Sequence, residues 1–96
     1  MYSKEEILKK NKKEIFDRFP ITQIGIFGSY LAGEQNSDSD VDILIEYNKK
    51  KKFSIIHFLK LRTFLSEVLE NKVDLVIKSK LKDAIGEQIL NQVKYL

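Results

Sequence analysis

The sequence predicts the α/β (α+β) class, with helices packed on a small mixed sheet of three strands. Apolar runs rich in β-branched residues occupy residues 22–27, 41–47 and 73–77, and helical patterns lie before, between and after them. The 96 residues, 43% of them hydrophobic and 32% charged, suffice for one modest core. We therefore expect a single domain over residues 1–96.

The first helix is predicted over residues 3–19. Ser3 and Glu6 have the spacing of a capping box, and apolar residues recur on one side of the pattern. Pro20 disfavours helical geometry in the residue before it, so the helix ends there. Residues 22–27 then read as the first strand.

The middle of the chain supplies a turn, a strand and a long helix. Residues 28–31 are expected to turn into a short helix, and residues 33–39 to form a polar loop. The second strand covers residues 41–47. Residues 54–70 form a helix that is apolar on most sides, so we expect it to be largely buried. Asn71 suits the left-handed position at its end.

The last part of the chain repeats the alternation. The third strand covers residues 73–77, and a last helix begins at Ser79 or Lys80 with an apolar residue at every fourth position. Helices and strands therefore follow one another as αβαβαβα. No internal repeat, low-complexity tract or linker interrupts this order.

Two small motifs stand on either side of the polar loop. Gly28-Ser29 follows the first strand, and a turn of this kind offers backbone N–H groups and a hydroxyl to an anion. Asp40 and Asp42 are two residues apart at the start of the second strand, so their carboxylates can project together toward one divalent cation. A phosphate cradle beside a metal clamp indicates phosphoryl or nucleotidyl transfer.

A third carboxylate, Asp74, lies near the start of the third strand. It joins the other two only if the third strand runs parallel to the second, with the helix over residues 54–70 as the right-handed crossover. The short connection between Gly28-Ser29 and Asp40 keeps the end of the first strand beside the start of the second, which makes these two strands antiparallel. Taken singly, Asp40 is better explained as part of a turn and Asp42 as an exposed strand residue; it is the complete set that favours a metal site.

These residues resemble the signature of the nucleotidyltransferases of the DNA polymerase β superfamily. The match is closest to the minimal nucleotidyltransferases, small proteins often partnered with HEPN-domain proteins in toxin–antitoxin pairs. The matching positions are Gly28, Ser29, Gly33, Ser39, Asp40 and Asp42. Leu31 and Ala32 depart from the pattern, and the basic residue usual in the family is absent at position 32. The resemblance extends through Asp74 and covers nearly the whole chain.

The resemblance implies a nucleotidyltransferase fold and a Mg²⁺-dependent transfer of AMP from ATP to a hydroxyl, with a tyrosine of a HEPN toxin as the expected acceptor. It implies that Asp40, Asp42 and Asp74 hold two Mg²⁺ or Mn²⁺ ions, and that Asp74 receives the proton of the acceptor. Gly28, Ser29 and Ser39 would bind the nucleotide.

Three alternatives stay open. The chain is either this enzyme or a non-catalytic antitoxin that neutralises its partner by contact, which the missing basic residue at Ala32 favours. The third alternative is an enzyme that acts on a small molecule, but such enzymes usually need a further domain to enclose the acceptor site. A domain this small would leave its cleft open to a protein partner or to a second copy in a homodimer.

The composition limits the expected cellular location, metal sites and binding partners of the protein. No apolar run approaches the roughly 18 residues of a membrane span, so we expect no association with a membrane. The chain has no cysteine, which favours a cytoplasmic location. His57 is the only histidine, which excludes a multi-histidine zinc centre. The net charge of +3 is either a solvated lysine surface or an attraction for ATP, RNA or an acidic protein. Without interleaved aromatic residues, direct nucleic-acid binding is the less favoured interpretation.

Overall fold

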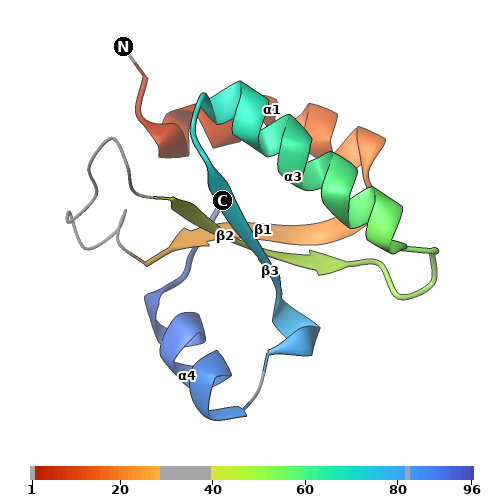
Figure 1. Ribbon diagram of the computed structural model, residues 1–96, viewed down its shortest axis with the longest axis vertical. Helices are drawn as coiled ribbons and strands as arrows, with labels where there is room; N and C mark the ends of the chain where they lie inside the picture. The colour runs from red at the N-terminus through yellow and green to blue at the C-terminus, as the bar shows by residue number, and fades with distance from the viewer. Residues whose placement is uncertain (1, 29–39, 82) are drawn as a thin grey trace.

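The computed structural model describes residues 2–28, 40–81 and 83–96. Its strands are β1 (Ile21–Phe27), β2 (Val41–Tyr47), β3 (Val73–Ile77) and β4 (Lys94–Tyr95). Its helices are α1 (Lys4–Arg18), α3 (Ile55–Leu69), α4 (Asp83–Gln92) and the 3₁₀ turn η1 (Lys78–Lys80). The strands form one sheet in the order β3-β2-β1-β4, with α1 and α3 on one face and α4 on the other (Figure 1). The expected α/β class is confirmed.

The helix α1 begins at the predicted capping box. The backbone N–H of Glu6 donates to Ser3 Oγ over 3.1 Å, and the Ser3 N–H donates to Glu6 Oε1 over 3.4 Å. Leu8 and Ile15 form its buried stripe. The helix ends one residue before Phe19, whose backbone is extended as the following proline requires.

The sheet has the topology that the aspartates require. β1 pairs antiparallel with β2, and β2 pairs parallel with β3 through the crossover helix α3. Val41, Ile43 and Ile45 of β2 are all buried in the core beneath α1 and α3. The intervening residues of β2, among them Asp42, therefore face the other side of the sheet.

The expected count of three strands and the expected last helix need correction. The helix α4 begins only at Asp83, after η1, and the chain then returns to the sheet as β4, which pairs antiparallel with β1. Gly25 allows this approach, because a Cβ at that position would lie 2.6 Å from Val93 Cγ1 and 3.0 Å from the carbonyl oxygen of Lys94. The close contact of two backbones is what adds the fourth strand.

The prediction that the helix over residues 54–70 is largely buried is wrong for its first half. Leu61, Leu65 and Leu69 of α3 are fully buried, whereas Ile55 is 69% exposed and Ile56 60% exposed. Only one side of α3 packs on the sheet and α1, and within the described residues the apolar side chains on its other sides stay exposed (Figure 1).

Two local predictions have different outcomes. The left-handed residue at the end of α3 is Glu70, with φ 51°, rather than Asn71. The short helix expected at residues 28–31 and the loop at residues 33–39 fall, apart from Gly28, outside the described residues. Within the described ranges, no helix is both long and apolar enough to cross a bilayer.

Candidate active site

Gly28 directly follows β1, in a conformation that favours glycine. Its φ is +76°, in the left-handed region where a side chain is strained. The lack of a side chain at Gly28 also leaves room for the Asp42 carboxylate, because a Cβ at this position would overlap its oxygen Oδ2. The glycine of the Gly-Ser motif therefore lies directly beside one of the predicted metal ligands.

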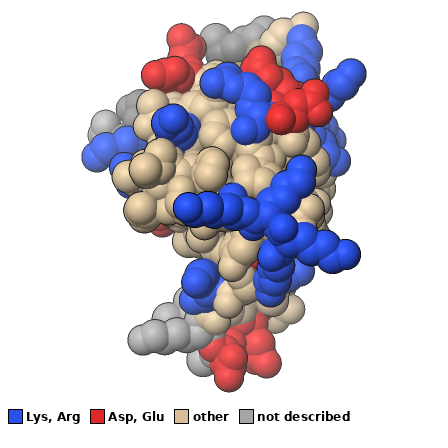
Figure 2. All heavy atoms as spheres, turned by 90° about the vertical axis from the view of Figure 1, so that its right-hand side faces the viewer, with Lys and Arg blue, Asp and Glu red and all other residues tan. Residues whose placement is uncertain are grey.

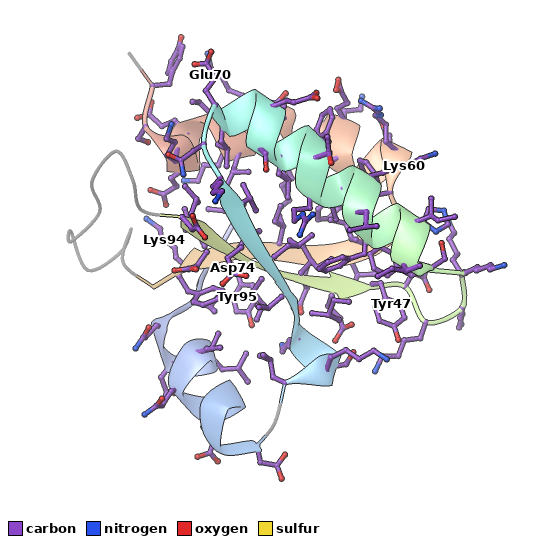
Figure 3. The ribbon with its side chains drawn as sticks, viewed as in Figure 1. Tyr47, Lys60, Glu70, Asp74, Lys94 and Tyr95 are labelled. Carbon is purple, nitrogen blue, oxygen red and sulfur yellow. The ribbon has the colours of Figure 1, made fainter. Side chains whose placement is uncertain are left out.

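Asp42 and Asp74 stand side by side. They are direct partners in the parallel pairing of β2 with β3, and paired residues of neighbouring strands project to the same face. The backbone N–H of Val41 donates to the carbonyl oxygen of Lys72 over 2.9 Å, which fixes the register at this end of the two strands. Asp42 is half-buried and Asp74 is exposed. Figure 3 shows Asp74 on the side of the sheet turned away from α3.

The other predicted site residues are placed less closely. Asp40 directly precedes β2 and is exposed, while Ser29 and Ser39 lie outside the described residues. In the part of the chain that the structure describes, no three Asp, Glu, His or Cys side chains are grouped so that they could hold one metal ion. Asp40, Asp42 and Asp74 thus reach the same end of the sheet without forming one coordination shell.

Asp42 and Asp74 nevertheless fit a divalent cation by their chemistry. Carboxylate oxygens are the ligands that Mg²⁺ prefers, and Mg²⁺ usually keeps several waters beside one or two protein carboxylates. Two like charges opposite each other on neighbouring strands repel, so a cation between them would relieve the repulsion. The remaining ligands would come from Asp40, from water or from a bound phosphate.

His57 has a structural role. Its Nδ1 accepts a hydrogen bond from the backbone N–H of Ser54 over 3.1 Å and lies 3.0 Å from Ser54 Oγ. It thereby completes the N-terminal cap of α3, in the place that glutamate takes in a common capping box.

An ion pair that the sequence did not indicate joins α1 to β4. Lys94 Nζ lies 2.6 Å from Glu5 Oε1. The hydrogen bond from Lys94 lowers the pKa of the Glu5 carboxyl below its usual value of 4.5, against the opposing effect of burial. Lys94 pairs with Ile26, so this contact lies on the α1 face of the sheet and not among the aspartates. Its only signal is the pairing of β4, which no local pattern predicts.

The comparison with known families decides the class of this site. The profile of the family described as "Nucleotidyltransferase domain" matches residues 8–96. The chain belongs to this family. It is a nucleotidyltransferase, as the Gly-Ser and Asp-x-Asp motifs predict, and the described part of its fold brings Gly28, Asp42 and Asp74 together.

Relatives and solved structures agree with the family. The chain is 44% identical over 92 residues to the protein adenylyltransferase MntA of Thermococcus cleftensis, covering 96% of this chain and 91% of that protein. A solved candidate minimal nucleotidyltransferase superposes with a TM-score of 0.76 at 26% identity, over 95% of this chain and 94% of that one. A toxin–antitoxin structure with AMP-PNP gives a TM-score of 0.73 at 26% identity, over 98% of this chain and 72% of that one.

Proposed function

We propose that this nucleotidyltransferase moves AMP from ATP to a tyrosine hydroxyl of a partner HEPN toxin, and so acts as the antitoxin of the pair. The observation that carries the proposal is the contact between three parts of one site. Gly28 lies against the Asp42 carboxylate, and Asp42 is the direct strand partner of Asp74. We also propose that residues 1–96 work as one domain, in the cytoplasm, as the absence of cysteine favours.

Each residue of the site has a proposed task. Gly28 lets phosphate oxygens approach the backbone, and Ser29 and Ser39 donate hydrogen bonds to the nucleotide. Asp40, Asp42 and Asp74 would hold two Mg²⁺ ions, for which Mn²⁺ could substitute. When bound, such ions would offset the negative charge of the phosphate oxygens and lower the pKa of the acceptor hydroxyl.

The proposed reaction is a displacement at the α-phosphorus of ATP. The tyrosine oxygen forms the new bond to this phosphorus, the bond to the bridging oxygen breaks, and pyrophosphate leaves. Asp74 receives the proton of the tyrosine hydroxyl. Its exposed carboxylate suits this task, because an acceptor carried by another protein must reach it from solvent.

The protein acceptor is supported by the relatives. The 44% identical MntA is named for adenylyl transfer to protein, and the structure with AMP-PNP is a toxin–antitoxin complex. Only the tyrosine, the HEPN partner and the use of ATP with Mg²⁺ go beyond those names, and they follow from the family resemblance of the motif.

A second candidate function is neutralisation by contact without catalysis. Ala32 stands where the family usually has a basic residue, and no three metal-binding side chains are grouped within the described residues. Loss of one phosphate contact would slow the transfer of AMP while leaving the surface that binds the toxin unchanged.

The deciding experiment mixes the purified chain with a HEPN toxin, ATP and Mg²⁺, and measures the mass of the toxin. We expect an added AMP on a tyrosine and equal release of pyrophosphate. The double variant Asp40→Asn, Asp42→Asn should lose both this product and the nucleotide-dependent binding of Mn²⁺. Toxin neutralised without any added mass, even by the wild-type chain, would establish the second candidate instead.

A further inference from the structure

The first half of α3 presents apolar side chains to solvent. Ile55 is 69% exposed, Ile56 60% and Leu59 43%. They occupy consecutive turns of one helix, so they form one continuous apolar patch. An exposed apolar patch of this kind, unlike single scattered residues, marks an interaction surface.

A groove continues the patch between α3 and the end of α1. It encloses about 690 Å³, and Leu59 and Lys60 form one of its sides. Phe19 and Phe64 also line it, with their ring centroids 5.9 Å apart. The guanidinium of Arg18 lies 4.6 Å from the centroid of the Phe64 ring, so a cation is held over an aromatic wall.

Basic side chains border this region. Residues 49–52 are four consecutive lysines, all exposed, in the loop that leads into α3. Arg18, Lys60 and Arg62 are exposed as well. Figure 2 views the molecule from the side on which this loop lies, and Lys and Arg side chains extend across that face beside uncharged surface. Glu67 also lines the groove, so its rim is mostly, but not wholly, basic.

We propose that the patch Ile55–Ile56–Leu59 and the adjoining groove are the docking surface for the partner toxin, through an amphipathic helix with acidic flanks. Apolar side chains of such a helix would enter the groove, and its carboxylates would meet the lysines. A second copy of this chain fits less well, because a symmetric dimer through this face would set two sets of lysines against each other. This inference rests on the proposed function for the identity of the partner.

The docking surface is separate from the site of chemistry. The first turn of α3 follows the end of β2, whereas Asp42 and Asp74 lie at the opposite end of β2 and on the other face of the sheet (Figure 1). A substitution on this surface should therefore weaken the binding of the toxin and leave the binding of ATP unchanged. This separation is what makes the proposal testable apart from catalysis.

The test compares Leu59→Asp with Leu90→Asp. Leu90 lies on α4 and is 40% exposed, close to the 43% of Leu59, so it is a matched control on another surface. Affinity for the HEPN toxin is measured by calorimetry, alongside thermal stability and nucleotide-dependent Mn²⁺ binding. We expect Leu59→Asp to weaken toxin binding at least about tenfold, as loss of an interface anchor does, with the other two measurements unchanged. Leu90→Asp should bind the toxin like the wild type.

Three results would overturn the proposal. Leu59→Asp could bind the toxin as the wild type does, the wild-type chain could form a dimer that Leu59→Asp dissociates, or single-stranded RNA could displace the toxin from the lysines. Failure of the proposed function gives a different pattern. A wild-type chain that binds the toxin, loses it through Leu59→Asp and transfers no AMP would retain this docking surface and lose the chemistry.

Discussion

The two faces of the sheet differ although they are built from the same strands. On the face toward α1 and α3, Val41, Ile43 and Ile45 of β2 are at most 2% exposed. On the other face, Asp42 of the same strand lies between Gly28 and Asp74. The alternation of β2 therefore places Val41, Ile43 and Ile45 in the core and Asp42 on the opposite face, where the buried Leu44 follows it two residues later.

This arrangement explains why so small a protein can hold adjacent like charges. The carboxylates lie at the ends of strands, where they are half-buried or exposed, so little hydrophobic burial is lost by placing them there. The core beneath α1 and α3 consists of aliphatic and aromatic side chains. Variants on the two faces should consequently have separable effects, one on the rate of transfer and the other on the free energy of unfolding.

The largest expected effect comes from Asp74→Asn. The change is nearly isosteric at an exposed position, so folding and toxin binding should remain as they are. It removes the proposed proton acceptor and a metal ligand, and we expect the turnover of AMP transfer to fall by roughly 10²–10⁴-fold while the affinity for ATP changes little. Single-turnover kinetics measures the fall.

The matched control is Asp17→Asn on α1, also an exposed aspartate on a different element. It should keep the wild-type rate. If Asp74→Asn transferred AMP as fast as this control, Asp74 would have no catalytic role, and the comparison between the two faces would fail at this carboxylate.

A core variant should have the opposite effect. Leu65 of α3 is fully buried between the sheet and α1, and Leu65→Ala leaves a cavity there. We expect it to lower the free energy of unfolding by about 2–5 kcal/mol, with an unchanged rate of AMP transfer for the fraction that stays folded. Denaturant unfolding followed by circular dichroism measures this loss. Leu90→Ala, at a position 40% exposed, should cost far less.

Most of the fold was predictable because its signals are local. The capping pair Ser3–Glu6 and the periodicity of β2 and β3 depend on residues that are neighbours in the sequence. The two-residue β4 is not, since its pairing depends on Gly25 meeting Tyr95 from far along the chain. The exposure of Ile55 was missed for a similar reason: a helix apolar on most sides does not reveal which side the rest of the fold will cover.

The site was predictable to a corresponding extent. The sequence predicts that Asp74 reaches Asp42 only if β2 and β3 are parallel, and the structure confirms this pairing. The direct contact of Gly28 with Asp42 was not foreseen, because it depends on the exact end of β1. The structure places Gly28, Asp42 and Asp74 beside one another, but the role of every predicted site residue stays a prediction.

Gly28 allows a sharper test of the site face. Gly28→Val places a branched side chain in left-handed backbone and against the Asp42 carboxylate. We expect ATP binding to be lost and stability to fall by about 1–2 kcal/mol from backbone strain. Calorimetry with ATP and thermal unfolding measure the two effects.

Gly28→Asn separates strain from space. Asparagine tolerates the left-handed region better than valine, but its Cβ meets the same oxygen of Asp42. We expect stability to recover in part and ATP binding to stay lost. Recovery of ATP binding as well would mean that backbone strain alone, and not the space beside Asp42, explains the glycine.

The smallest expected effect concerns the ion pair between Glu5 of α1 and Lys94 of β4, on the face of the sheet that α1 covers. Because the hydrogen bond from Lys94 depresses the pKa of Glu5 in the folded chain below its usual value of 4.5, the pair stabilises the fold above that pH. This contribution is lost as the pH falls through the folded pKa. Lys94 is 56% exposed, so we expect the pair to contribute at most about 1 kcal/mol to the free energy of unfolding.

Glu5→Gln should therefore lower the thermal stability slightly at pH 7 and converge with the wild type at low pH, whereas AMP transfer at pH 7 should not change. An equal loss at both pH values would assign the effect to packing of the side chain rather than to its charge.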